Sequence, residues 1–279
     1  MCSSDLKIWL SVFFLPPAML AVDILTPFFA SALVLKLKPV TYLWGRQLLK
    51  KARKKRDNFK NLIVIGITGS YGKSYTKEYL YTILSQKFRV LKTEKNINAE
   101  AGIARTVLER LHQSYQIFIA EIGAYNKGKI RQVCLAIKPN AGILTGINEQ
   151  HMATFGSQEN IISAKFELLE SLPEKGAAIV NGKNEFIRQE LPKRKIKAEV
   201  LDMASMAAKN IKTEKEYLYF ELEGVKFKVN VLGRHNLDNL LLAIRCAVKA
   251  GMTLDEISAA CLKIKNNTLV RKSPAIINN

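Results

Sequence analysis

Apolar and polar positions alternate along most of this chain in a way that predicts strands and helices in turn. From residue 61 onward, short runs rich in β-branched residues are separated by longer stretches whose apolar residues recur at helical spacing. The expected strands are LIVIGI, FRVLKT, QIFIAE, AGILTG and AAIVN, and the expected helices include KSYTKEYLYTILSQ and QENIISAKFELLESL. Such alternation indicates an α/β fold with a mostly parallel sheet and helices on both faces.

A different pattern follows towards the end of the chain. The segments YLYFELEG and VKFKVNVL alternate apolar and polar residues on either side of Glu223-Gly224. This pattern predicts an antiparallel hairpin at the edge of a sheet. Two helices, at about 236–250 and 253–264, are expected to follow it.

The first 45 residues are far more apolar than the rest. Asp23 is the only charged residue between Ile8 and Leu35. Because a bilayer span needs about 20 apolar residues, this segment predicts a membrane anchor over residues 1–45, either a tilted helix bent near Pro16-Pro17 or a re-entrant hairpin. A buried helix pair of a soluble domain is the alternative. A cleaved signal peptide is disfavoured by the length of the apolar run.

Charge reinforces this interpretation. The chain has 43 Lys and Arg against 24 Asp and Glu, a net charge of +19, and a basic run, KLKPVTYLWGRQLLKKARKKRDNFK, follows the apolar segment. Residues 46–60 are therefore expected to be a basic juxtamembrane linker beside anionic membrane lipids. Because basic flanks stay on the inner side, the remaining chain is expected on the cytoplasmic face of the cell membrane. Nucleic acid is not an expected partner.

The remaining composition is that of a globular protein, with 48% apolar and 24% charged residues. Its four cysteines are scattered and form no CxxC pair. They are expected to be reduced, mostly buried thiols rather than metal ligands.

A glycine-rich stretch, Gly66–Glu78, reads GITGSYGKSYTKE and follows the apolar run NLIVI. It ends in GKS like a phosphate-binding loop, yet its glycines stand at 66, 69 and 72, and Ile67 occupies the position where the usual spacing requires glycine. A strand before the loop and a helix after it would point backbone N–H groups at phosphate oxygens. Lys73 would reach the β- and γ-phosphates, and the Ser74 hydroxyl would bind Mg²⁺.

Other candidate residues stand near expected strand ends. Glu121 ends QIFIAE, where the carboxyl end of a strand meets the ligand crevice. His151 and His235 lie in polar, turn-rich segments, and surface decoration is the alternative for each. Lys165 lies on the apolar face of an expected helix, where a buried ammonium needs a partner. No guanine-binding signature is present, because Asn126-Lys127 is followed by Gly-Lys. ATP is therefore the expected nucleotide.

These residues carry a family resemblance. GITGSYGKSYTKE resembles the phosphate loop of the Mur ligase family, G-x-T-G-[ST]-x-G-K-[ST]-[ST], which has this glycine spacing. Further segments that match the family follow in order: KTEKNINAEAGIARTVL, AEIGAYNKGKI, ILTGINEQHMATFGSQENIISAKFELLESLPEKGAAIVN and VLGRHNLDNLLLAI. The resemblance implies that residues 61–270 are the family's central ATP-binding domain and that 271–279 begin a missing or truncated C-terminal domain.

The resemblance also implies a reaction. Family enzymes transfer the γ-phosphate of ATP to a carboxylate, and an amine then displaces phosphate to form an amide. By this resemblance Lys73, Lys165 and His151 are catalytic, Lys165 matches the lysine that many family members carbamylate, and Mg²⁺ is held by Ser74, Glu121 and His151. The implied nucleotide-binding residues are Thr68, Gly69, Ser70, Gly72, Lys73, Ser74, His235, Asn236 and Asn239. Asn96 and Asn98 are implied to meet the acceptor substrate.

The resemblance favours UDP-muramoyl peptide and D-alanyl-D-alanine as substrates, in cell-wall synthesis. Two alternatives stay open: a ligase of the same family for another acidic polymer of the poly-γ-glutamate type, and a non-catalytic nucleotide-binding scaffold at the membrane. The run from Asn181 to Asn184, NGKN, replaces the family's usual Asn-x-Asp-Asp, so two acids are absent. A separate chain is expected to supply the C-terminal domain if the sequence is not a fragment.

Overall fold

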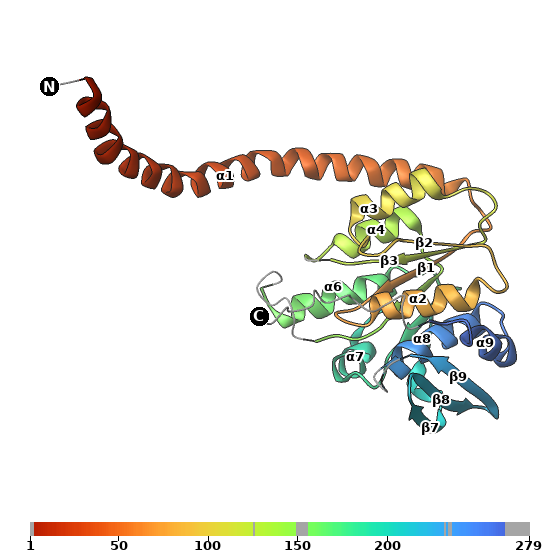
Figure 1. The fold of residues 1–279 in the computed structure, drawn as a ribbon. Coiled ribbons are helices and arrows are strands. Elements are labelled where there is room, and N and C mark those ends of the chain that lie inside the picture. Colours follow the sequence, from red (N-terminus) through yellow and green to blue (C-terminus); the bar gives the residue numbers. More distant parts are fainter. Residues whose placement is uncertain (1–2, 125, 149–155, 232, 234–235, 266–279) are drawn as a thin grey trace. The chain divides into compact units, whose positions relative to one another are not determined.

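The computed structural model describes residues 3–124, 126–148, 156–231, 233 and 236–265 (Figure 1). The chain divides into two compact units, Met1–Gln47 and Leu48–Asn279. The second unit contains all of the strands that the structure describes.

A six-stranded parallel sheet forms the centre of the second unit, with strand order β2-β3-β1-β4-β5-β6. Each neighbouring pair of strands is parallel, which confirms the α/β fold with a mostly parallel sheet. The sequence pattern predicted the first five of these strands but not β6. The strands are β1 (Ile63–Thr68), β2 (Val90–Lys92), β3 (Ile117–Glu121), β4 (Ala141–Leu144), β5 (Ala177–Val180) and β6 (Glu199–Asp202).

Helices cover both faces of this sheet (Figure 1). Alternate residues of β1 enter different clusters: Ile65 and Ile67 pack with helices α2 and α8, whereas Val64 packs with α3 and α4. Because both faces are buried, the strand is an almost continuous apolar run. The helices are α2 (Lys73–Leu84), α3 (Glu100–Arg105), α4 (Lys129–Ile137), α6 (Gln158–Glu170), α7 (Glu185–Glu190), α8 (Asn236–Lys249) and α9 (Leu254–Cys261), with short 3-10 or π turns at Thr106–Arg110, Leu191–Lys193 and Met203–Ser205.

The hairpin predicted around Glu223-Gly224 is present, but it does not extend the main sheet. Strands β8 (Tyr217–Leu222) and β9 (Val225–Asn230) pair antiparallel and form a separate three-stranded sheet with β7 (Lys209–Glu214). The buried rings of Phe220 and Phe227 stack with centroids 4.8 Å apart, and both belong to the cluster that contains α8 and α9. The hairpin therefore packs through its apolar face, and the expectation that it forms a sheet edge was wrong in this respect.

The first helix, α1 (Ser3–Asp57), is one continuous helix. The re-entrant hairpin is therefore wrong for this segment. Pro16-Pro17 do not end the helix, because a proline inside a helix removes a hydrogen bond and bends the axis without having to reverse the chain. Among the residues that the structure describes, no helix combines the length and the apolar character that crossing a bilayer requires.

The last turns of α1 belong to the second unit and are anchored there. Leu49 and Ala52 are buried with the residues of α3 and α4. The buried guanidinium of Arg56 donates to three backbone carbonyls: Nε to Ile137 at 3.1 Å, and the two terminal nitrogens to Phe59 at 2.7 Å and Leu62 at 3.0 Å. Part of the expected basic linker is thus the packed C-terminal end of α1, which lies shortly before β1 in the chain.

The three described cysteines, Cys134, Cys246 and Cys261, are buried and unpaired with one another. Burial raises the pKa of Cys134 to about 12, so this thiol stays protonated at neutral pH. The expectation of reduced, buried thiols holds for these three residues.

Replacing Arg56 by Met tests the anchoring of α1. The substitution leaves three buried carbonyls without their donor, so we expect the free energy of unfolding to fall by about 2–4 kcal/mol. Urea unfolding of the full chain measures this loss. The matched control is Arg53→Met, since Arg53 lies one turn earlier and is exposed. Equal stability of the two variants would contradict the role given to Arg56.

Candidate active site

The carboxyl ends of three neighbouring strands meet at one edge of the sheet. In the register of β1, Ile67 pairs with Glu121 of β3, and Thr68 pairs with Leu144 of β4. The Thr68 hydroxyl donates to the carbonyl of Ile122 at 2.9 Å, and the Thr68 carbonyl accepts from the N–H of Thr145 at 3.0 Å. The segments after β1, β3 and β4 therefore leave the sheet side by side.

Geometry explains the glycine spacing of the loop after β1. At Gly69 (φ +151°) an added Cβ would lie 2.1 Å from the Thr145 hydroxyl oxygen and 3.0 Å from the Gly146 carbonyl oxygen. At Gly72 (φ +78°) it would lie 2.2 Å from the side-chain oxygen of Asn239. At Gly66 it would lie 2.7 Å from Leu168 of α6. Two glycines thus shape the loop, and the third lets a helix pack closely on β1.

The loop ends at the N-terminus of α2. Gly72 caps this helix in the left-handed conformation and offers no side-chain acceptor to the first-turn N–H groups, and no acidic residue stands in the first turn. The positive end of the helix is therefore available to an anion. This arrangement is the one that a phosphate-binding loop requires.

A part-buried lysine, Lys73, and a buried lysine, Lys165, lie in this region. Lys73 folds over its own loop and donates to the carbonyls of Gly69 at 2.7 Å and Ser70 at 3.3 Å. Burial lowers the pKa of Lys73, and the charge of Glu121 opposes this. Burial lowers the pKa of Lys165 to about 8, with a further lowering by the charge of Lys73, while Glu167 opposes both. The two ammonium groups repel each other, so an anionic ligand between them would be stabilised.

Ser74 and Glu121 form the second part of the site. The Ser74 hydroxyl lies 3.1 and 3.0 Å from the two carboxylate oxygens of Glu121, which is almost fully buried. A hydroxyl and a carboxylate are the hard oxygen ligands that Mg²⁺ prefers, and Mg²⁺ in nucleotide sites takes its other ligands from phosphates and water. The described residues contain no group of three or more His, Cys, Asp and Glu that could hold a metal. Ser74 and Glu121 therefore fit a nucleotide-associated Mg²⁺.

The two asparagines expected at the acceptor differ in their placement. Asn98 lies beside the metal end of the site, with its side-chain nitrogen 3.5 Å from a carboxylate oxygen of Glu121 and its carbonyl accepting from Gly123 at 2.8 Å. Asn96 has a positive φ of 65° and is exposed in the same loop. The structure thus brings Asn98 into contact with Glu121, and Asn96 lies at the exposed surface of the loop.

The residues expected on the nucleotide side lie at the start of α8. The Thr76 hydroxyl lies 3.4 Å from the side-chain oxygen of Asn239, which also approaches Gly72. Asn236 is buried, and its N–H donates to Gly233 at 3.2 Å. His151 and His235 lie outside the described residues. Their assigned roles stay predictions.

The segment 181–184, which lacks two acids of the family pattern, contacts α8 and the phosphate loop. Lys183 forms an ion pair of 2.9 Å with Asp238 of α8. The side chain of Asn184 donates to the Tyr71 hydroxyl at 3.1 Å and to the Ile147 carbonyl at 2.9 Å. A lysine thus occupies part of the place where the family pattern has acids, and it takes an acidic partner from α8.

Sequence reasoning gave no role to Lys77. Its side chain is 1% exposed and its ammonium lies 3.1 Å from a carboxylate oxygen of Glu121. The available signal was its spacing, because a residue four positions after Lys73 lies on the same face of α2. The GKS motif points to Lys73, whereas Lys77 stands only within the stretch that resembles the family's phosphate loop.

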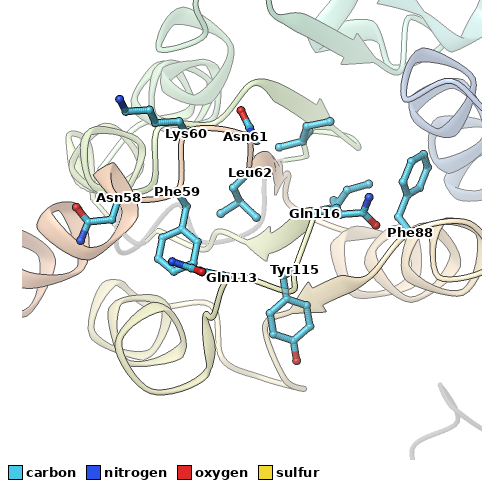
Figure 2. Close-up of a pocket in the computed structure, with 11 residues that line it drawn as sticks. Asn58, Phe59, Lys60, Asn61, Leu62, Phe88, Gln113, Tyr115 and Gln116 are labelled. Carbon is cyan, nitrogen blue, oxygen red and sulfur yellow. The ribbon is translucent and has the colours of Figure 1, made fainter.

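A separate hollow of about 480 Å³ lies at the opposite edge of the sheet (Figure 2). It is bordered by the amino ends of β1 and β3, far along each strand from the phosphate loop. Among the described residues, no carboxylate or histidine lines it. Its lining residues are Asn58, Phe59, Lys60, Asn61, Leu62, Ile63, Phe88, Gln113, Tyr115, Gln116 and Ile117.

The parallel sheet and its glycine-rich loop define a phosphate-loop α/β domain. Residues 67–247 match the family described as Mur ligase middle domain, and the chain belongs to the Mur ligase family. The resemblance found in the sequence is thereby confirmed.

Known relatives agree with this assignment. The chain is 33% identical over 211 residues to UDP-N-acetylmuramoyl-tripeptide–D-alanyl-D-alanine ligase of Escherichia coli (strain K12), covering 72% of this chain and 46% of the relative. Its identity to the ligase of the same name from Bacillus subtilis (strain 168) is 30% over 195 residues, covering 69% and 42%. The chain thus spans less than half the length of these curated relatives.

Solved structures show the same likeness. MurF from Acinetobacter baumannii aligns with a TM-score of 0.73 at 26% identity, covering 81% of this chain and 52% of that one. MurF from Thermotoga maritima in complex with ADP aligns with a TM-score of 0.71 at 26% identity, covering 80% and 52%.

Proposed function

We propose that this chain is the nucleotide-binding part of an ATP-dependent amide ligase that adds D-alanyl-D-alanine to a UDP-muramoyl tripeptide. The observation that carries the proposal is the pairing of a cationic phosphate loop with the adjoining Ser74–Glu121 pair. The names of the relatives from Escherichia coli and Bacillus subtilis support this choice of substrates.

In this proposal the chain acts by positioning and charge. The first-turn N–H groups of α2 and the ammonium of Lys73 bind the phosphate oxygens of ATP. Ser74 and Glu121 hold Mg²⁺, which when bound neutralises phosphate charge. An oxygen of the acceptor carboxylate bonds to the γ-phosphorus as the bond to the leaving ADP oxygen breaks. The incoming amine then bonds to the acyl carbon, the bond between this carbon and the phosphate oxygen breaks, inorganic phosphate leaves, and the nitrogen releases one proton to solvent.

Replacing Lys73 by Ala tests the phosphate site. The variant loses a part-buried cation of the phosphate loop, so we expect the Kd for Mg-ATP to rise about 30-fold or more and ATP turnover to be abolished. Calorimetric titration measures the binding, and phosphate release by the full-length ligase measures turnover. The control is Lys60→Ala, because Lys60 is exposed and borders the hollow at the other edge of the sheet. Unchanged binding in the Lys73 variant would contradict the assignment.

Lys165 is proposed to carry a carbamate. The neutral amine attacks carbon dioxide, a C–N bond forms, and one proton is released to solvent. A pKa of about 8 supports this, because the neutral fraction at neutral pH is far larger than for an ordinary lysine. Carbamate formation would replace a cation near Lys73 with an anion. This anion could form an ion pair with Lys73 or bind Mg²⁺.

Carbon-13 NMR of the chain in labelled bicarbonate tests this step. Because only the neutral amine reacts, we expect a carbamate resonance that grows as the pH rises from about 7 to 9, through the lowered pKa of Lys165. The resonance should be lost in Lys165→Arg and kept in Lys175→Arg, an exposed lysine. A carbamate signal that survives in the Lys165 variant would disprove the site.

The start of the chain is proposed to bind the cytoplasmic face of the cell membrane. Between Met19 and Trp44 the described apolar side chains of α1 are exposed, with Phe28 and Phe29 at 70% and 72%. Ten lysines and arginines between residues 36 and 60 would add attraction to anionic headgroups. An exposed apolar helix beside a basic run supports a lipid partner for this segment.

Vesicle flotation of the full chain tests this proposal. We expect the native chain to float with phosphatidylcholine vesicles that contain phosphatidylglycerol, and Phe28→Asp/Phe29→Asp to weaken this strongly, because charge in an apolar layer is costly. The control Leu262→Asp places a charge at another exposed apolar side chain. Equal flotation of all three proteins, or none by the native chain, would contradict a lipid-binding role for α1.

A further inference from the structure

The carboxylate expected to hold Mg²⁺ already has a cationic partner. Lys77 and Glu121 have side chains 1% and 3% exposed, and the lysine nitrogen lies 3.1 Å from the carboxylate oxygen Oε2. The Ser74 hydroxyl lies 3.0 Å from the same oxygen. The Ser74 hydroxyl and the Lys77 ammonium therefore both contact the same oxygen of the Glu121 carboxylate.

Burial makes this pairing consequential. An ionised carboxylate removed from water is costly unless a charge or several hydrogen bonds satisfy it. The backbone of Glu121 is also fixed, because its N–H donates to the Thr93 hydroxyl at 3.0 Å. The hydrogen bond to Thr93 thus holds in place the end of β3 that carries the carboxylate.

Lys77 is itself held by oxygen atoms from different elements. Besides Glu121 of β3, its ammonium contacts the carbonyl of Glu94 in the loop after β2 at 3.3 Å and a carboxylate oxygen of Glu78 at 3.8 Å. Glu78 in turn pairs with Lys92, which is part-exposed. These contacts place a full positive charge at a fixed point beside the metal end of the phosphate loop.

The two lysines of α2 have different partners. Lys73 donates to carbonyls of the phosphate loop, whereas Lys77, four residues later, lies against the Glu121 carboxylate. One face of α2 therefore places Lys73 at the phosphate loop and Lys77 at the proposed metal ligand.

We propose that Lys77 is an internal counter-cation for the metal site. Its ammonium holds the buried Glu121 carboxylate in place when no metal is bound, and it competes with free Mg²⁺ for that carboxylate. Mg²⁺ then binds well only together with nucleotide phosphates, which supply the additional negative charge. Lys77 is thus a positioning residue, and its role rests on the part of the proposed function that places Mg²⁺ at Ser74 and Glu121.

Thermal unfolding of the full chain, without nucleotide and over a Mg²⁺ titration, tests this role. We expect the native chain to respond weakly to Mg²⁺. In Lys77→Met the unpaired carboxylate should lower the Tm without metal, and Mg²⁺ should raise it again, with an apparent affinity about tenfold or more tighter than that of the native chain. Lys77→Arg should respond like the native chain because it keeps the charge.

Two further variants separate charge from packing. Lys77→Met/Glu121→Gln removes both charges, so we expect it to be more stable than Lys77→Met and insensitive to Mg²⁺. Lys92→Met removes a lysine from the same network without exposing Glu121, and we expect it to respond like the native chain. If Lys77→Met does not fold without metal, folding of the double variant supports the proposal.

Several outcomes would overturn the proposal. They are a Lys77→Met variant with the Mg²⁺ response of the native chain, a double variant that is no more stable than Lys77→Met, and a double variant that still responds to Mg²⁺. None of these depends on ligase activity. Failure of ATP turnover in the full-length protein would disprove the proposed reaction while leaving the Mg²⁺ response of Lys77→Met to be decided by unfolding alone.

Discussion

The parallel register of β1 between β3 and β4 is the constraint on which the candidate site depends. It aligns Ile67 with Glu121 and Thr68 with Leu144, so that the loop after β1 leaves the sheet between the ends of its two neighbours. The loop glycines are then required by close contacts with the segment after β4 and with α8. A shift of this register would separate the phosphate loop from the carboxylate that the proposed Mg²⁺ needs.

Charge within this frame is arranged for an anionic ligand. Burial, and then the charge of the part-buried Lys73, lowers the pKa of Lys165, whereas the nearby carboxylate of Glu121 is already paired with Lys77. An anion beside Lys73 and Lys165 would be stabilised by their charges, and nucleotide phosphates would also bring the negative charge that allows Mg²⁺ to compete with Lys77.

Much of the central domain follows from local pattern, because strands buried on both faces form distinct apolar runs and the phosphate loop has its own glycine spacing. The predictions were weaker where tertiary packing decides the outcome. Strand β6 is half exposed and has no apolar run, and the hairpin packs on α8 and α9 in a sheet of its own. The role of Lys77 required knowing that β3 ends opposite the second turn of α2, which spacing along the chain does not reveal.

The central claim is that the loop after β1 binds nucleotide phosphates beside a Ser74–Glu121 magnesium site. A crystal structure of the chain with Mg²⁺ and a non-hydrolysable ATP analogue tests it most directly. The account predicts phosphate oxygens within hydrogen-bond distance of the Lys73 ammonium and of the first-turn N–H groups of α2, and a Mg²⁺ bound by Ser74 and Glu121. Nucleotide density at another surface, or phosphates that do not contact Lys73, would contradict it.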